Sequence, residues 1–370
     1  MPITAYSNAF KSELSVEQFK DKYEELIDKP NIHEFVKTDI ECSCCGSTGA
    51  KIISEGISSK TKQKVKQTHF AFRDENGGDS HKVFCDHYSG EDKQSTATNE
   101  VLIDLLKKSQ SEVTLLIGKF VSTAIQNNIF SQEDIRNMRQ WFFNMRSRQD
   151  FMVENSTHHL NIIKKTIFYI NKDSSKEYVI DKNILNKDNF DLDQEVYKSL
   201  ATKFPFPQKA KEINGLTSYF HRKEIIKKAI SISKKGHGMY EFDREILQEK
   251  YNLATKLSLS IVKSNSLLSR KISYSHTAVR SKNPLMAYAA TLLFVNNWNI
   301  EKAAEMHNLI ENLPNTDNSL GNVIGLNPFI NYEAWITLKF SSIWKNDFTE
   351  YNFDEEFNKE KNRLEEIYGL

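Results

Sequence analysis

The four cysteines of the 370-residue chain lie close together near its N-terminus, as Cys42, Cys44, Cys45 and Cys85. Random placement would confine four cysteines to so short a window less than about once in a hundred sequences, so the spacing carries information. Cys42-x-x-Cys45 brings two thiolates to one metal ion through a tight turn, and Gly46 supplies the backbone freedom of that turn. We therefore expect a metal centre in this part of the chain.

A third thiolate and a histidine complete the predicted centre. The sequence Cys85-Asp86-His87 can close the site from the far side, and His87 is the candidate nearest to a cysteine. The reach from Cys85 to His87 is short, so His69 stays open as an alternative fourth ligand. The predicted ligand set consists of Cys42, Cys45, Cys85 and either His87 or His69.

Four protein ligands make such a centre structural. A Zn²⁺ ion held in this way has no open position for a substrate, so it stabilises a fold and does no chemistry. Cys44 is expected to stay out of the site, because adjacent side chains of extended backbone point to opposite sides.

Two other interpretations stay open: a redox pair at Cys42 and Cys45, which lacks a surrounding βαβ pattern, and clustered thiols with no ligand role. We expect a cytoplasmic protein with reduced thiols, which favours zinc over a disulfide.

The same segment resembles a known bacterial family. Cys42-Ser-Cys-Cys45-Gly46 is followed by the apolar run Lys51–Ile53 and by Thr68-His-Phe-Ala-Phe72. This order is similar to the N-terminal zinc-binding segment of competence protein CoiA and related bacterial proteins, over about residues 40–90. Phe72 stands where the family has its second histidine. The resemblance implies that His69 is a ligand and that Cys85 or His87 replaces the missing one. The family's nuclease-like part is not recognisable downstream, so its activity is not carried over.

Composition and periodicity predict the elements that position these residues. The chain has 50 Lys and Arg, 49 Asp and Glu, 39% hydrophobic residues, and only 13 Gly and 7 Pro, which favours a soluble protein rich in helices. The predicted fold is mainly α: a small N-terminal α+β zinc-binding module followed by an irregular all-α domain. The predicted domains are 1–98 and 99–370, with a subdivision near 170–207, and the polar stretch 89–99 is the candidate linker.

Capping residues and hydrophobic periodicity locate the individual helices. Ser15 and Gln18 form a capping box before a helix that ends near Pro30, and Ser131 and Asn299 are further predicted N-caps. Asn283-Pro284 is interpreted as a cap and a first helical residue. Residues 35–88 are expected to form small strands around the metal, and 178–180 is a weaker strand candidate. The remaining predicted helices cover residues 101–124, 132–148, 241–264, 285–295, 300–313, 332–343 and 353–368.

Local charge suggests a polyanionic partner, although the net charge is only +1. Basic residues gather in three runs, of which the third covers residues 209–235. Such segregation makes a basic face on a neutral molecule, and phosphate backbones bind to faces of this kind. We expect DNA or RNA binding without strong sequence specificity, in a bacterial defence, DNA-uptake or mobile-element system. The predicted phosphate contacts are Lys60, Lys62, Lys64, Lys66, Arg136, Arg139, Arg146 and Arg148.

Other functions stay open as alternatives. The chain contains no phosphate-binding loop and no dinucleotide-binding glycine pattern, so the balance is against an enzyme. Arg270 and His276 fit the Arg-x(4–6)-His pattern of HEPN ribonucleases, but chance predicts about one such match in this composition. A metal-dependent nuclease with a dispersed active site, and a non-catalytic subunit that binds protein partners in a larger complex, are the alternatives. No apolar run is long enough to span a membrane, so we expect no membrane partner.

Overall fold

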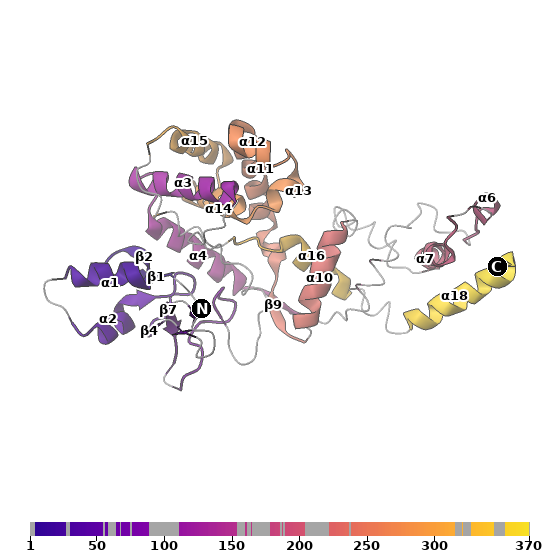
Figure 1. Cartoon of the computed structure of the whole chain (residues 1–370), viewed down its shortest axis with the longest axis horizontal. Coiled ribbons are helices and arrows are strands. Elements are labelled where there is room, and N and C mark those ends of the chain that lie inside the picture. Colours follow the sequence, from indigo (N-terminus) through magenta and orange to yellow (C-terminus); the bar gives the residue numbers. More distant parts are fainter. Residues whose placement is uncertain are drawn as a thin grey trace. The chain divides into compact units, whose positions relative to one another are not determined.

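The computed structural model describes residues 4–26, 30–54, 56–57, 64–66, 68–74, 76–88, 111–153, 160, 164, 178–185, 187, 189–203, 222–236, 238–314, 320, 327–343 and 352–369. The fold is mainly α, with a small sheet region at the N-terminus (Figure 1), as the sequence predicts. The chain divides into two units by its internal contacts. The first unit contains Met1–Asp150 and Phe242–Ile330, and the second contains Phe151–Glu241 and Asn331–Leu370.

Short antiparallel strands and two helices build the N-terminal part of the first unit. A three-stranded sheet has the order β2-β1-β3, and two strand pairs, β4 with β7 and β5 with β6, follow it. In the β4–β7 pair, Ile53 lies opposite His69. The elements are β1 (Thr4–Ser7), β2 (Ser12–Ser15), α1 (Val16–Glu24), α2 (Ile32–Asp39), β3 (Ile40–Glu41), β4 (Ala50–Ile53), β5 (Gly56–Ile57), β6 (Lys64–Lys66) and β7 (His69–Phe72).

Aromatic side chains from the helices and the sheet fill the core of this N-terminal part. The predicted capping box is confirmed: the Ser15 hydroxyl accepts from the Gln18 N–H, and the Gln18 side chain accepts from the Ser15 N–H. It starts α1 so that Phe19 faces inward, where its ring meets Phe70 of β7 edge-on at 6.1 Å. The four cysteines are buried in the same cluster, which places the candidate metal ligands inside the fold.

A helical layer completes the first unit. The helix α14 is buried along most of its length, and both α3 and α11 pack against it. Ser131 caps α4 through a second capping box, with Asp134 as the reciprocal partner. Asn299 caps α15 as predicted. The elements are α3 (Glu112–Gln126), α4 (Gln132–Arg146), the 3-10 helix η2 (Arg244–Leu247), α11 (Gln248–Ser264), α12 (Ser266–Lys271), α13 (His276–Arg280), α14 (Asn283–Val295) and α15 (Ile300–Glu311).

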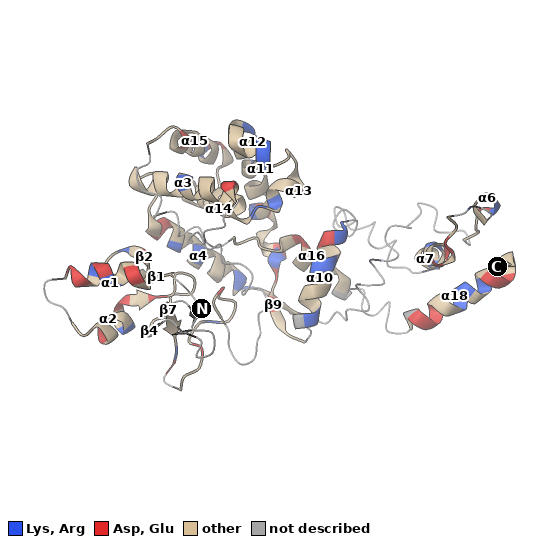
Figure 2. Cartoon of the chain, viewed as in Figure 1, with Lys and Arg blue, Asp and Glu red and all other residues tan. Residues whose placement is uncertain are grey.

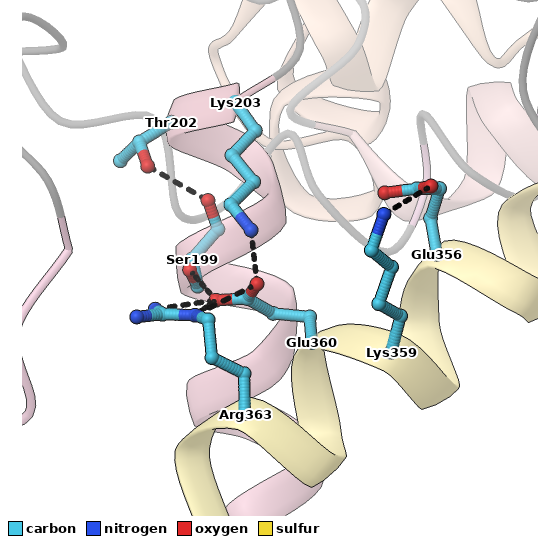
Figure 3. Close-up of polar contacts among 7 residues, drawn as sticks. All are labelled: Ser199, Thr202, Lys203, Glu356, Lys359, Glu360 and Arg363. Atoms are coloured by element: carbon cyan, nitrogen blue, oxygen red, sulfur yellow. Dashed lines mark hydrogen bonds and ion pairs between the residues drawn. The ribbon is translucent and has the colours of Figure 1, made fainter. Parts of the chain in front are cut away.

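The second unit consists mainly of paired helices. The helix α10 packs on α16, and α7 packs on α18. Glu360 of α18 accepts hydrogen bonds from Ser199 and Lys203 of α7 and from Arg363, and these contacts join the two helices (Figure 3). The elements are α6 (Lys182–Leu185), α7 (Leu192–Lys203), α10 (Lys223–Gly236), α16 (Tyr332–Ile343) and α18 (Phe353–Tyr368), while the short strands β8 (Asp150–Met152) and β9 (Tyr240–Phe242) pair with one another.

The structure differs from the sequence predictions at several boundaries. The helix predicted over 241–264 begins only at Gln248, because the Asp243 side chain accepts from the Glu245 N–H and starts a separate 3-10 turn. Residues 178–180 are not a strand. The linker 89–99 and the helix start at 101–110 lie outside the described residues. By internal contacts, α3 and α4 share a unit with the N-terminal sheets.

Hydropathy along the helices bears on the membrane prediction. Within the described ranges, no helix is both long enough and apolar enough to cross a bilayer.

Candidate metal centre

Two short turns bring four candidate ligands together. Cys42 directly follows β3, and the turn to Cys45 is closed by a 2.9 Å hydrogen bond from the Gly46 N–H to the Cys42 carbonyl. Gly46 has a φ of +70°, which glycine adopts without a steric penalty. His81 and Cys85 come from the segment after β7, where Asp79 accepts a 2.9 Å hydrogen bond from the His81 N–H.

The ligand atoms of Cys42, Cys45, His81 and Cys85 all lie within 4.8 Å of one another, and all four residues are buried. The Sγ atoms of Cys42 and Cys85 are 3.7 Å apart. His81 Nδ1 is 3.5 Å from Cys45 Sγ and 3.7 Å from Cys85 Sγ. A disulfide needs sulfur atoms about 2.05 Å apart, and all four cysteines are free thiols. Three thiols and one imidazole thus form a buried group that could hold a metal ion.

Burial and mutual contact perturb the protonation of these thiols in opposite directions. Burial raises the pKa of both Cys42 and Cys85. Hydrogen bonds from Cys42 and Cys85 lower the pKa of Cys45, and a hydrogen bond from His81 adds to that effect. Without a cation, buried thiolates this close together repel one another, whereas a divalent ion stabilises all of them as thiolates. A divalent cation at this position would therefore offset the cost of ionising the buried thiols.

The structure corrects the predicted histidine. His81 belongs to the group, whereas His87 and His69 do not. His87 is buried beside the group, with its ring centroid 5.7 Å from that of His81, and burial lowers its pKa to about 3. Its backbone N–H donates to Cys85 Sγ at 3.5 Å. His69 is buried on β7.

Cys44 lies outside the four-residue group, as expected from its position next to Cys45. Its thiol donates to Asp86 Oδ2 at 3.6 Å. The other oxygen of Asp86 accepts from the Arg146 guanidinium of α4. No local pattern in the sequence singles out His81, because residues 81–85 form turns and not a helix. The prediction of His87 rests only on its closeness to Cys85 along the chain.

Two of the predicted phosphate contacts on α4, Arg139 and Arg146, are buried. Arg139 is 6% exposed and forms a 2.5 Å ion pair with Glu13, and it also donates to Ser43 at 3.1 Å. Arg146 is 4% exposed, pairs with Asp86 and lies 5.2 Å from the centre of the Phe242 ring. Buried, paired guanidiniums do not reach a phosphate from solution, so these two arginines attach α4 to the N-terminal strands and the metal-centre turns.

The remaining predicted contacts divide into four groups. Arg136 is mostly buried, pairs with Glu41 and stacks on the Tyr6 ring at 4.3 Å, so its charge is also compensated within the fold. Arg148 is exposed beyond the end of α4. Lys64 and Lys66 occupy both ends of strand β6, which pairs with β5. Lys60 and Lys62 lie outside the described residues.

Comparisons of the chain with protein-family models, with curated proteins and with solved structures find no match. The similarity to the CoiA zinc-binding segment therefore stays a prediction from the sequence.

Proposed function

We propose that this chain is a zinc-containing, nucleic-acid-binding protein whose metal ion is structural. The zinc centre in this proposal rests on the buried group of Cys42, Cys45, His81 and Cys85. A tetrahedral zinc with Zn–S bonds of about 2.3 Å and Zn–N bonds of about 2.0 Å has S···S edges of about 3.8 Å and S···N edges of about 3.5 Å. Three of the six separations in this group, at 3.7, 3.5 and 3.7 Å, match those edges, and the others are within 4.8 Å.

The ligand set determines what the zinc does in this proposal. All four positions are filled by protein atoms, so no position is left for water or substrate, and the ion acts as a cross-link. It joins the turn after β3 to the segment after β7, which are separated by about forty residues of chain. The strand pairs β4–β7 and β5–β6 lie in that interval, so their placement depends on the ion.

Basic residues on the zinc-fixed segment support the nucleic-acid half of the proposal. Lys64 and Lys66 lie on β6, and Lys51 on β4 is exposed. The arginines of α4 no longer contribute, because their charges are compensated inside the fold. Lysines make nonspecific contacts to phosphate, so we expect binding that weakens steeply with salt and has little sequence preference.

Metal analysis tests the zinc centre, and a binding titration tests nucleic-acid binding. We expect one zinc per purified full-length chain by inductively coupled plasma mass spectrometry. We also expect fluorescence anisotropy to detect binding to labelled DNA or RNA oligonucleotides. The double variant Lys64→Gln and Lys66→Gln should bind more weakly than the control Lys20→Gln and Lys37→Gln, which removes two exposed lysines from α1 and α2. A metal-free yet fully folded protein would refute the zinc centre. Equal binding by the two variants would exclude β6 as a contact.

A further inference from the structure

Residues 250–300 contain no aspartate or glutamate. The chain has 49 acidic residues in 370, so a stretch of this length should contain about seven. The same stretch holds seven basic residues, at positions 250, 256, 263, 270, 271, 280 and 282. It spans α11, α12, α13 and α14 in the first unit, and it is separate from the three basic runs that the sequence patterns single out.

The fold gathers these basic residues on one group of helices. Both α12 and α13 pack on α11, and Figure 2 marks the lysines and arginines of these helices in blue. Lys256 and Lys263 are exposed and lie two helical turns apart on α11, so they share a face at a spacing of about 10 Å. Arg270 is exposed on the last turn of α12. We call Lys256, Lys263, Arg270 and the exposed Tyr274 the cationic surface.

The charges of the cationic surface are not compensated within the described part of the chain. Lys256 and Lys263 contact no carboxylate there, and Arg270 donates only to the Ser266 carbonyl, at 3.1 Å. Neighbouring acids are engaged with other groups: Glu112 pairs with Lys271, Glu249 with Lys250, and Glu311 accepts from Asn265.

Helices elsewhere in the chain follow a different pattern. Three of their lysines have acidic partners one turn away, in the pairs Lys198–Glu195, Lys227–Glu224 and Lys359–Glu356. An ordinary solvent-exposed helix face carries such mixed charge. Apart from Glu249 in the first turn of α11, which pairs with Lys250, the helices α11, α12 and α13 contain no acidic residue. Such an excess of cations indicates a surface that meets an anionic partner.

Tyr274 identifies the kind of anion. It lies in the link between α12 and α13, and its side chain is 65% exposed, the second most exposed of the large hydrophobic side chains that the structure describes. Tyr274 follows Arg270 by four residues, in a segment without acidic residues. An exposed aromatic ring in such a segment provides a stacking surface for an unpaired base, while nearby cations hold the phosphates. A duplex hides its base faces, so it cannot use such a ring. We propose that the cationic surface binds single-stranded nucleic acid, a specification that rests on the proposed nucleic-acid-binding function.

Anisotropy titrations with the zinc-loaded full-length protein test this assignment. The probes are a fluorescein-labelled 20-nucleotide single strand, the matching duplex, and vesicles of phosphatidylserine and phosphatidylcholine. The surface variant combines Lys256→Gln, Lys263→Gln and Arg270→Gln. Its matched control combines Lys20→Gln, Lys37→Gln and Lys302→Gln, which removes three exposed lysines elsewhere in the same unit.

We expect the wild type to bind the single strand more tightly than the duplex. The surface variant should lose roughly 100-fold in affinity at 0.1 M salt, and the slope of log K against log salt should become shallower by about 2. Tyr274→Ala should weaken single-strand binding about fivefold or more, whereas Tyr274→Phe should retain it because the ring remains. Unchanged far-UV circular dichroism shows that each variant is folded, as substitution of exposed side chains predicts.

The outcomes that overturn this proposal are distinct from those that overturn the general function. If nucleic acid binds but the surface variant and its control bind equally, the cationic surface is not the site, and the β6 lysines account for the binding. Tighter binding of the duplex than of the single strand, or of vesicles alone, would overturn the single-stranded partner. A wild type that binds none of the oligonucleotides would overturn the nucleic-acid function as a whole.

Discussion

Arg146 of α4 forms an ion pair with Asp86, the residue that directly follows the candidate metal ligand Cys85. The guanidinium is buried, and Asp86 raises its pKa although burial alone would lower it. The second carboxylate oxygen of Asp86 accepts from the Cys44 thiol. This chain of contacts connects a helix of the first unit to the turn that carries two of the four predicted zinc ligands.

The variant Arg146→Ala should destabilise the first unit strongly. It leaves the Asp86 carboxylate without its cation in a largely buried position, which costs about 3–5 kcal/mol in the free energy of unfolding. The control Arg148→Ala, at an exposed position two residues further on, should change that free energy by no more than about 0.5 kcal/mol. Urea unfolding monitored by tryptophan fluorescence measures both, and equal effects would contradict the structural role of Arg146.

Substitution of His81 should remove the bound zinc. His81→Ala deletes one of four ligands, so the zinc content of the purified protein should fall well below one per chain, and His81→Cys should restore it because four thiolates also bind zinc. His87→Ala should keep the metal, since the His87 ring lies outside the group. Zinc retained in His81→Ala and lost in His87→Ala would reverse the ligand assignment.

Local interactions could be predicted from the sequence with good accuracy. Ser15, Ser131 and Asn299 cap helices through their own side chains, as predicted, because capping depends on residues within one turn. The helices α16 and α18 begin and end at the predicted residues. The Asn283-Pro284 signal was displaced by one residue, with Lys282 as the N-cap of α14. Cys42, Cys45 and Cys85 belong to the metal group because their type and clustering already pointed to it.

Contacts between residues far apart in the chain determine the features that the sequence does not predict. The choice of His81 over His87 depends on how the chain turns between residues 81 and 87, which no local pattern specifies. Arg139 and Arg146 resemble a solvent-exposed basic face in the sequence. Their partners Glu13 and Asp86 are 126 and 60 residues away, so their burial emerges only from the tertiary structure.

The stability of the second unit should depend on pH through Glu360. Burial alone raises the pKa of this carboxyl, but hydrogen bonds from Arg363, Lys203 and Ser199 outweigh it and the pKa is lowered. A carboxyl with a lowered pKa in the folded state stabilises that state above its ordinary value near 4.5, and the contribution disappears as the pH falls through the lowered pKa.

The variant Glu360→Gln therefore has a predictable pH profile. It should cost about 1–3 kcal/mol of unfolding free energy at pH 7, and the difference from the wild type should shrink toward zero below pH 4.5. Glu356→Gln is the matched control, because among the described residues the Glu356 carboxylate pairs only with the exposed Lys359, at 3.9 Å (Figure 3), and should cost less than about 1 kcal/mol. Urea unfolding at pH 7 and pH 3.5 measures the four differences. A cost for Glu360→Gln that is the same at both pH values would contradict an ionised Glu360.

Asn265 should stabilise the junction between α11 and α12 in two ways. Its side-chain oxygen accepts from the N–H groups of Leu267 and Leu268 at 3.0 and 2.9 Å, and its amide nitrogen donates to Glu311 at 2.6 Å. Asn265→Ala removes both contacts and should cost about 1–2 kcal/mol. Asn265→Asp keeps the cap but places a second carboxylate against Glu311, so it should destabilise the protein at pH 7 and recover part of the loss near pH 4, where carboxylates become protonated. Thermal unfolding of both variants at these two pH values separates the contributions. A loss for Asn265→Asp that does not depend on pH would show that the contact with Glu311 adds nothing to the cap.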